Sequence, residues 1–507
     1  MRSSSDGEAR PLVVNVEDEP QERARSPSGI YKTYKSRWII LGILALLNVS
    51  NAMNWLSFAP VANAAKEYYR VGEFPITALS LVFFILSIPI GFFGSWLLDV
   101  YDLRVGIWVG AWLNAIGAIV RYLSRFGRSY PIVIVGQVLC AAAQPFILFA
   151  PTKLASFWFP DDQRALATML STMANPLGVG IANLASPAIV TKAALTESFE
   201  RMLWIYAVPA CAGALLTSLC VWKSRPPTPP SFSAGEGSQN NFWSGLKKVY
   251  KFKSYLILML SWSIGVGLFN AFQTFLEQML CIRGYTDSFS GLCGALLIFG
   301  GIPGAIATAV FVDRTRRFGE TLKVVFVFAV ICQFWFVGVM RLEDEKALIA
   351  ASLSTFGFFA LALMPVWLEL GVECTYPDLS EATSSGLLWI AGQIMGIVFV
   401  GLALIPGLTT KIELSIPNQC NVNTKNSSSP LVNGTYNHYG NHTYNHYGNQ
   451  TVSDLTNFGW CTCGISLAIC FIMIAFFWPT YRRLEAETKA KAEASATSGS
   501  EEITTEC

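Results

Sequence analysis

The chain has 507 residues, of which 52% are hydrophobic and only 14% are charged, and its mean hydropathy is +0.43. A soluble domain carries about 25% charged residues, so this composition excludes an ordinary soluble protein and indicates a polytopic membrane protein. The formal net charge of +2 gives no indication of a nucleic-acid partner. Residues 1–35 are polar and charged, so we expect a disordered cytoplasmic N-terminus without a signal peptide.

Twelve apolar runs are long enough to cross a bilayer as helices. The first six are Trp38–Asn63, Pro75–Leu98, Val105–Leu123, Tyr130–Pro151, Arg164–Val190 and Met202–Trp222. The last six are Tyr255–Met279, Phe289–Val312, Thr321–Met340, Ala347–Cys374, Ser380–Pro406 and Phe458–Trp478. We therefore expect an all-α membrane protein with twelve transmembrane helices.

The polar segment 223–253 separates the sixth run from the seventh. It contains RPPTPPS near its start and several lysines near its end, which predicts a cytoplasmic linker ending in a basic amphipathic helix on the membrane surface. The chain thus divides into an N-terminal six-helix bundle at 36–222 and a C-terminal six-helix bundle at 254–480. The tail at 481–507 is rich in Ala, Ser, Thr and Glu, and we expect it to be cytoplasmic and, beyond Leu484, disordered.

Two independent signals give the orientation. With the N-terminus in the cytoplasm, lysine and arginine collect on the inner segments, as the positive-inside rule requires. The loop 407–457 then falls outside, and it carries N-x-S/T glycosylation sequons at Asn426, Asn433, Asn441 and Asn449. This low-complexity loop also holds all three histidines, for which a glycosylated spacer is a better interpretation than a metal-sensing loop. We expect a monomer in the plasma membrane with both termini in the cytoplasm.

A short charged loop follows the second run and recurs after the eighth, as GSWLLDVYDLR at Gly94–Arg104 and VFVDRTRRF at Val310–Phe318. The recurrence indicates a duplicated helical bundle. The gating candidates in these loops are Asp99, Arg104, Asp313, Arg314 and Arg317. Ion pairs of the two aspartates with these arginines and with Arg316 would hold the two halves closed on the cytoplasmic side, and alternating access would break those pairs. The alternative is that the arginines only anchor the loops by the positive-inside rule.

The first run carries an unusual polar face. Asn48, Asn51, Asn54 and Trp55 fall within about a third of the helix circumference at 100° per residue. Polar groups inside a membrane helix are costly, so each needs a partner or a role. One interpretation is a face that lines a central cavity, and the other is hydrogen bonding between helices.

Further amides lie in later runs, where aromatic residues accompany some of them. The fourth run has Gln144, the seventh has Asn270 among phenylalanines, and the eleventh has Gln393. Amides with aromatics and few charges suit a polar organic solute, including a cation held over an aromatic face. Packing between helices is the alternative for each amide taken alone. The fifth run contains NPLG at Asn175–Gly178, where the proline predicts a bend near the midplane.

Two carboxylates lie in the tenth run. Glu373 is near its inner end and would pair with an inner-loop arginine, whereas Glu369 is one turn deeper and is the better candidate to meet a cation or a proton. No histidine or aspartate lies mid-membrane, which favours facilitated diffusion over energy-coupled transport. The sequence shows no Walker loop, nucleophile elbow, metal-ligand cluster or channel filter, so we expect neither an enzyme nor a channel, and no cofactor.

Two six-helix halves with D-x-x-D-x-R and D-R-x-R-R motifs resemble the major facilitator superfamily. Within it, several blocks are similar to the feline leukaemia virus subgroup C receptor (FLVCR)-related family, solute carrier family 49, and most of all to its A3 subfamily. The blocks are Asn51–Val61, Ser95–Arg104, Gly136–Pro160, Asn175–Gly178, Leu368–Pro377 and Ser384–Ile397.

This resemblance implies a twelve-helix transporter of choline or ethanolamine, with haem as a second proposed substrate. It places the family's cation-facing tryptophan on Trp55, its two site glutamines on Gln144 and Gln393, and its aromatic partner position on Asn270. We add Asn51 and Glu369 as further substrate-binding candidates from the patterns above. We expect alternating-access uniport of a small polar or cationic solute. The alternatives are a haem transporter, and a receptor or scaffold that transports nothing.

Overall fold

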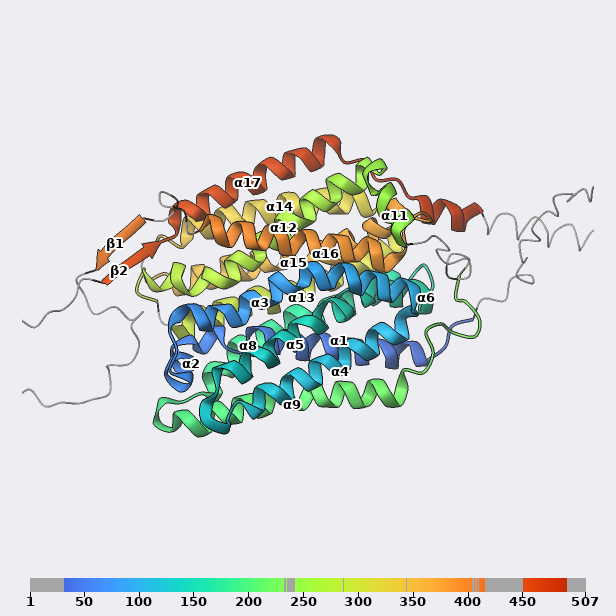
Figure 1. Ribbon diagram of the computed structural model, residues 1–507. Coiled ribbons are helices and arrows are strands. Elements are labelled where there is room, and N and C mark those ends of the chain that lie inside the picture. Colours follow the sequence, from blue (N-terminus) through green and yellow to red (C-terminus); the bar gives the residue numbers. More distant parts are fainter. Residues whose placement is uncertain are drawn as a thin grey trace, which may run out of the picture.

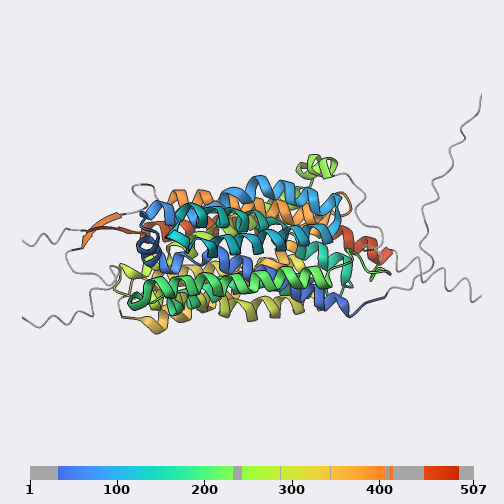
Figure 2. The same cartoon turned by 60° about the horizontal axis from the view of Figure 1, so that its bottom comes forward.

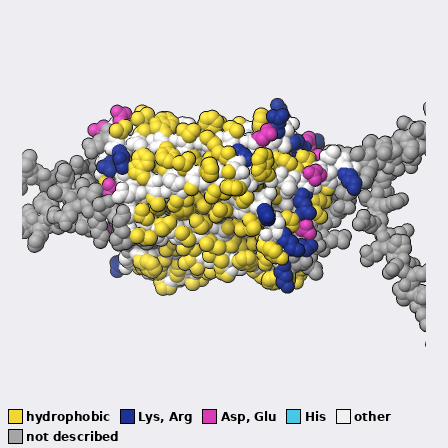
Figure 3. Space-filling view, turned by 90° about the horizontal axis from the view of Figure 1, so that it is seen from above, with side chains coloured by type: hydrophobic (Ala, Val, Ile, Leu, Met, Phe, Trp, Pro, Cys, Tyr) yellow, Lys and Arg dark blue, Asp and Glu magenta, His cyan; other side chains and the backbone are white. Residues whose placement is uncertain are grey.

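The computed structural model describes residues 32–231, 234, 242–285, 287–342, 344–403, 405, 408, 410–414 and 450–489. It contains twelve helical spans that are long and apolar enough to cross a membrane, as the hydropathy predicts. They pack side by side in one elongated bundle (Figure 1). Figure 3 shows hydrophobic side chains along the middle of one face and charged side chains gathered toward the ends, which is the surface of a protein that spans a bilayer.

The N-terminal half consists of six spans, two of which are formed by two consecutive helices. Its helices are α1 (Ser36–Leu56), α2 (Ala62–Tyr69), α3 (Glu73–Val100), α4 (Asp102–Leu123), α5 (Tyr130–Leu148), α6 (Ala150–Trp158), α7 (Arg164–Thr172), α8 (Ala174–Ile189) and α9 (Leu195–Cys220). The fifth span is interrupted at Met173, between α7 and α8. Pro176 has no N–H to donate to the carbonyl of Thr172, which accounts for an interruption in the span where the sequence predicted a bend.

The C-terminal half consists of six unbroken spans. They are α12 (Lys253–Cys281), α13 (Asp287–Thr315), α14 (Phe318–Val339), α15 (Lys346–Thr375), α16 (Glu381–Leu402) and α17 (Thr456–Phe476). The linker contributes α11 (Phe242–Lys248) and the 3₁₀ turn η4 (Val249–Lys251). Figure 2 shows α11 as a short helix that stands away from the bundle.

The two ends of the bundle differ. We call the end that carries α6, α11 and residues 479–489 the terminal end, and the opposite end the hairpin end (Figure 1). The hairpin consists of β1 (Thr410–Leu414) paired antiparallel with β2 (Gln450–Asp454). These strands frame the loop 407–457, for which no regular structure was expected. All four sequons of that loop lie outside the described residues.

Residues 482–489 form a further helix, which corrects the expectation that the tail is disordered from Leu484 onward. Two residues of this helix are almost completely buried, namely Arg483 at 3% exposed and Glu487 at 2% exposed. The expectation of disorder rested on composition alone. Composition does not show that these two charged side chains form ion pairs with buried residues.

Glycines let α13 and α15 approach closely. A Cβ on Gly357 would lie 1.9 Å from the carbonyl oxygen of Leu297, and a Cβ on Gly304 would lie 2.0 Å from that of Phe358. Both obstacles are backbone atoms, which cannot swing aside as a side chain can.

We expect Gly357→Val to destabilise the protein by about 3 kcal/mol, at the upper end of overpacking effects. Gly338→Val is the matched control, because nothing lies within 4 Å of a Cβ at Gly338 in α14. The measurement is the melting temperature of each purified variant in detergent. Equal melting temperatures for the two variants would contradict the close approach of α13 and α15.

Candidate functional site

The two halves meet along α3 and α16. Ser87, Gly91 and Ser95 are spaced four residues apart and therefore share one face of α3. A Cβ on Gly91 would lie 2.8 Å from Ile390 of α16, and a Cβ on Gly386 would lie 2.2 Å from the Ser95 hydroxyl. The pairing is antiparallel, since residues rising along α3 face residues falling along α16. Ser87 therefore faces the level of Gln393, one turn beyond Ile390.

Three of the predicted substrate-binding residues lie beside this contact. The Ser87 hydroxyl donates a hydrogen bond to Gln144 Oε1 at 2.9 Å, which puts Gln144 at the level of Gln393. The Trp55 ring lies 5.6 Å from the ring of Phe84, about one turn before Ser87 on α3, in an edge-to-face arrangement. Trp55, Gln144 and Gln393 thus come from α1, α5 and α16 to one level of the bundle.

Asn270 reaches the same region from α12. The backbone of α12 approaches α16 at Gly267, where a Cβ would lie 2.8 Å from Met395. The Asn270 side-chain nitrogen is 3.5 Å from the place of a Cβ on Gly396, three residues beyond Gln393. Both helices of this contact belong to the C-terminal half, so Asn270 and Gln393 form its side of the candidate site.

Buried polar atoms without partners mark this region. The Trp55 indole N–H and the Gln393 amide oxygen Oε1 are both buried. Among the described residues, the N–H donates no hydrogen bond and the oxygen accepts none. An unpaired buried donor or acceptor costs about 1–3 kcal/mol. One donor and one acceptor at the same level of the bundle can bind a small polar solute that supplies the complementary groups.

The asparagines of α1 instead bond within the N-terminal half. Asn51 donates to Asn114 Oδ1 at 3.1 Å and to the carbonyl of Cys140 at 2.9 Å, and Asn54 donates to the same Asn114 oxygen at 3.4 Å. Asn48 donates to the carbonyl of Ile147 at 3.4 Å. These are the interhelical hydrogen bonds of the alternative interpretation, so Asn51 stands apart from the other candidates.

Arg121 of α4 completes this network, and the sequence analysis missed it. Its side chain is 1% exposed, donates to Asn54 Oδ1 and Ser57 Oγ, and lies 4.8 Å from the centre of the Phe58 ring. A guanidinium fork suits two acceptors one turn apart on α1. Arg121 thereby fixes the stretch of α1 that carries Trp55. In the sequence, an arginine at the end of an apolar run is expected to lie in the headgroup region or in water. Only the packing of α4 against α1 shows that Arg121 is buried.

An apolar cavity lies inside the C-terminal half, between α12, α14, α15 and α17. Its lining includes the aromatic side chains of Phe269, Phe326, Phe356 and Trp367 and the amide of Gln333. None of the predicted substrate-binding residues lines it, so this cavity is separate from the candidate site between the halves.

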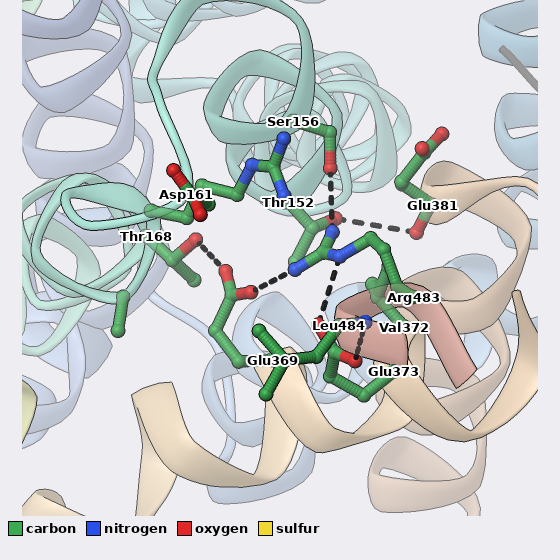
Figure 4. A network of polar contacts seen from close by, with 12 residues as sticks. Thr152, Ser156, Asp161, Thr168, Glu369, Val372, Glu373, Glu381, Arg483 and Leu484 are labelled. Carbon is green, nitrogen blue, oxygen red and sulfur yellow. Dashed lines mark hydrogen bonds and ion pairs between the residues drawn. The ribbon is translucent and has the colours of Figure 1, made fainter. Parts of the chain in front are cut away.

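Arg483 joins the two halves at the terminal end (Figure 4). It lies 2.9 Å from Glu369 and 2.9 Å from Glu373, both on α15, and it donates to Ser156 Oγ of α6 at 3.1 Å. Burial alone would lower the pKa of Arg483, but Glu373, Glu369 and Glu487 outweigh it and raise that pKa above its usual value. The guanidinium is therefore a permanent cation between two buried carboxylates.

Glu369 and Glu373 are thus occupied. Glu369 also accepts a hydrogen bond from Thr168 of α7, and the two carboxylates are 2% and 4% exposed. The predicted pairing of Glu373 with an arginine is confirmed, although the arginine belongs to the tail. Glu369 lies in the same network, near the C-terminal end of α15, where Arg483 and Thr168 already occupy its carboxylate. The carboxylate pair was visible in the sequence, but its cation was not.

Asp99 also binds across the halves, with partners that differ from the predicted one. It accepts hydrogen bonds from the hydroxyls of Ser380 and Thr383 at the start of α16, and it lies 3.6 Å from Lys153 of its own half. Arg104 instead lies over the rings of Trp108 and Trp222, at 5.4 and 5.6 Å. The predicted Asp99–Arg104 pair is therefore wrong, because Arg104 points toward α9 at the outside of the bundle.

Asp313 is the counterpart of Asp99 in the second half. It accepts hydrogen bonds from the backbone N–H groups of Ala165 and Leu166, at 3.1 and 2.9 Å. These groups begin α7, where the helix dipole favours a carboxylate. Arg317 pairs with Glu320 on an exposed surface, at 3.7 Å, and Arg314 is exposed. The predicted pairing of Asp313 with these arginines is therefore wrong, and a helix end takes their place. Arg316, the third arginine predicted for Asp313, pairs with Asp161 at 3.8 Å.

Comparison with known proteins shows the family. A family model described as "Major Facilitator Superfamily" matches residues 44–400. "Solute carrier family 49 member A3" of Xenopus tropicalis is 40% identical over 469 residues, which are 90% of this chain and 90% of that one. The chain is a member of solute carrier family 49, within the major facilitator superfamily. The predicted resemblance to this family and its A3 subfamily is confirmed.

This family member is also similar to a more distant transporter and to a solved structure. "Choline/ethanolamine transporter FLVCR2" of Rattus norvegicus is 27% identical over 379 residues, covering 73% of this chain and 69% of that one. The crystal structure of the E. coli fucose:proton symporter FucP matches with a TM-score of 0.60 at 16% identity, over 88% of this chain and all of that one. The solute carrier family 49 member is thus a multi-pass membrane transporter with the major facilitator fold.

Proposed function

We propose that this protein carries a small polar or cationic organic solute, of the choline and ethanolamine class, by alternating access. The observation that carries the proposal is the gathering of Trp55, Gln144, Gln393 and Asn270 at the contact between the halves, with a free indole N–H and a free amide oxygen. The indole face can hold an ammonium group, and the amides can bond a hydroxyl or amine. The similarity to the choline/ethanolamine transporter FLVCR2 supports the same solute class.

The proposed orientation makes the terminal end cytoplasmic, at the plasma membrane. The halves are joined there by Arg483, Asp99 and Asp313, so this arrangement corresponds to a carrier that is shut toward the cytoplasm. The proposed transport step breaks these contacts and closes the hairpin end. The protein would act as a monomer. It would act as a uniporter because Glu369, Glu373, Asp99 and Asp313 are engaged by cations, hydroxyls or a helix end.

We expect Trp55→Ala to lower uptake of the carried solute by about 30-fold, since a desolvated cation–π contact contributes about 2 kcal/mol. Trp204→Ala is the matched control, because Trp204 is 54% exposed on α9, and its uptake should equal that of the unmodified protein. The measurement is uptake of labelled choline, ethanolamine and haem by cells that express each variant, repeated across a range of pH.

Three results would overturn the proposed site or solute class, and a fourth would overturn the proposed uniport. If Trp55→Ala leaves uptake unchanged, Trp55 is not part of the substrate-binding site. Uptake of haem alone would favour the haem transporter. Uptake of none of the three compounds would favour a receptor or scaffold. A steep dependence on pH would replace uniport by proton coupling.

A further inference from the structure

The linker between the halves ends in a basic and aromatic surface. We define the linker surface as Trp243, Lys247, Lys248, Tyr250 and Lys251, on α11 and η4. Trp243 and Tyr250 are 64% and 69% exposed, and Lys247 and Lys251 are also exposed. The candidate membrane span of α12 begins at Lys253, directly after η4. The linker surface therefore lies at the boundary where a bilayer would meet the terminal end.

Neighbouring elements extend this surface. Arg482 lies 5.3 Å from the ring of Phe252, and Lys323 of α14 lies 4.5 Å from the ring of Trp478. Ser254 of α12 donates to the carbonyl of Trp478 at 2.7 Å, which brings that tryptophan, 73% exposed, beside the linker. Figure 3 shows Lys and Arg side chains gathered at this end of the molecule.

One carboxylate faces these cations. Asp378, in the loop between α15 and α16, is 3.1 Å from Lys248 and 3.1 Å from Arg482. Burial alone would raise the pKa of Asp378. The lowering of that pKa by Lys248 and Arg482 together is larger than the effect of burial, so the net shift is downward and the carboxylate stays ionised. Lys247 and Lys251 form no ion pair with any residue that the structure describes. The surface therefore carries more positive charge than Asp378 neutralises.

Such a surface has the chemistry to bind anionic lipid. Exposed tryptophan and tyrosine side chains prefer the headgroup region of a bilayer, and clustered lysines attract anionic headgroups. We propose that the linker surface binds the phosphate of anionic phospholipids, and that this phosphate takes the place of Asp378 on Lys248 and Arg482.

The exchange of Asp378 for lipid phosphate would act on the contacts that close the terminal end. Asp378 precedes Ser380, which bonds Asp99, and Arg482 precedes Arg483, which bonds Glu369 and Glu373. The pair of Asp378 with Lys248 and Arg482 thus ties the linker to two of the three contacts that join the halves, those of Asp99 and Arg483. Lipid phosphate on these cations releases the linker from the loop between α15 and α16, so the lipid composition of the membrane sets how firmly the terminal end is closed.

The first test measures lipid binding without transport, so its outcome is independent of the proposed substrate. The full-length protein in detergent is titrated with phosphatidylserine, and bound lipid is counted by native mass spectrometry. We expect the triple variant K247Q/K248Q/K251Q to bind phosphatidylserine on the order of 100-fold more weakly, at about fivefold per lysine. The matched control R70Q/R341Q/K346Q removes the same charge from exposed positions at the hairpin end and should bind normally.

Two outcomes of this titration would overturn the proposed surface. One is equal weakening in the triple variant and its control, which would reflect net charge alone. The other is displacement of phosphatidylserine by inorganic phosphate at equal concentration, which would indicate a site for free anions rather than a lipid surface. Phosphatidylcholine, which has no net charge, should bind both variants alike.

The second test addresses the exchange. Asp378→Asn removes the competing carboxylate, so we expect it to tighten phosphatidylserine binding about fivefold. Asp102→Asn is its control, because Asp102 is also a partly exposed aspartate at the terminal end but faces Arg225, at 3.9 Å. If the two variants bind phosphatidylserine equally well, lipid phosphate does not replace Asp378.

Discussion

Replacing Arg483 by glutamine is expected to lower the free energy of unfolding by about 3–5 kcal/mol, the usual cost of removing one partner from a buried ion pair. Glu369 and Glu373 would remain buried without their cation, and Ser156 of the other half would lose its donor. Arg482→Gln is the matched control, because Arg482 pairs with Asp378 at a partly exposed site and should cost about 1 kcal/mol or less.

The same variant is expected to open the terminal end. Cys374 is buried beside Glu373, so its thiol can report opening in a protein from which the other cysteines have been removed. We expect labelling of Cys374 by a water-soluble thiol reagent to be faster in Arg483→Gln than in Arg482→Gln. The double variant Arg483→Gln/Glu373→Gln should recover part of the lost stability, because it removes one unpaired charge. Labelling and stability that are the same in both single variants would show that Arg483 does not hold the halves together.

Asp99→Asn is the second change with a large expected effect. Asp99 receives two hydroxyl hydrogen bonds from α16 and lies beside Lys153, which is buried. The amide would leave Lys153 without a counter-charge and would weaken both bonds across the halves. We expect a loss of about 3–5 kcal/mol in the free energy of unfolding, together with faster labelling of Cys374.

Thr383→Val separates the loss of a hydrogen bond between the halves from the loss of the charge that pairs with Lys153. It removes one hydrogen bond between the halves, of about 1.5–3 kcal/mol to a charged acceptor, and it leaves Asp99 and Lys153 paired. A weakening of 2 kcal/mol changes the ratio of closed to open protein about 30-fold. We expect Thr383→Val to speed labelling while costing less stability than Asp99→Asn. A Thr383→Val variant that labels as slowly as the unmodified protein would exclude this contact from the gate.

Hydropathy and backbone chemistry were enough to predict the architecture. Each span must satisfy its backbone hydrogen bonds within itself and present apolar side chains, so its existence can be read from about twenty consecutive residues. The break before Pro176 follows from one missing N–H. The family could likewise be recognised from contiguous blocks of sequence, because each block is a continuous run of residues whose recognition needs no knowledge of tertiary contacts.

Side-chain partners were decided only by the tertiary structure. Asp99 and Asp313 were recognised as gating candidates, yet their partners proved to be hydroxyls, Lys153 and a helix end rather than the arginines nearby in sequence. Arg483 and Arg121 gave no local sign of burial. Which side chains meet depends on the rotation and spacing of helices that are far apart along the chain, and no single stretch of sequence contains that information. The sequence shows that a buried charge needs a partner, and the packing of the helices determines which residue it is.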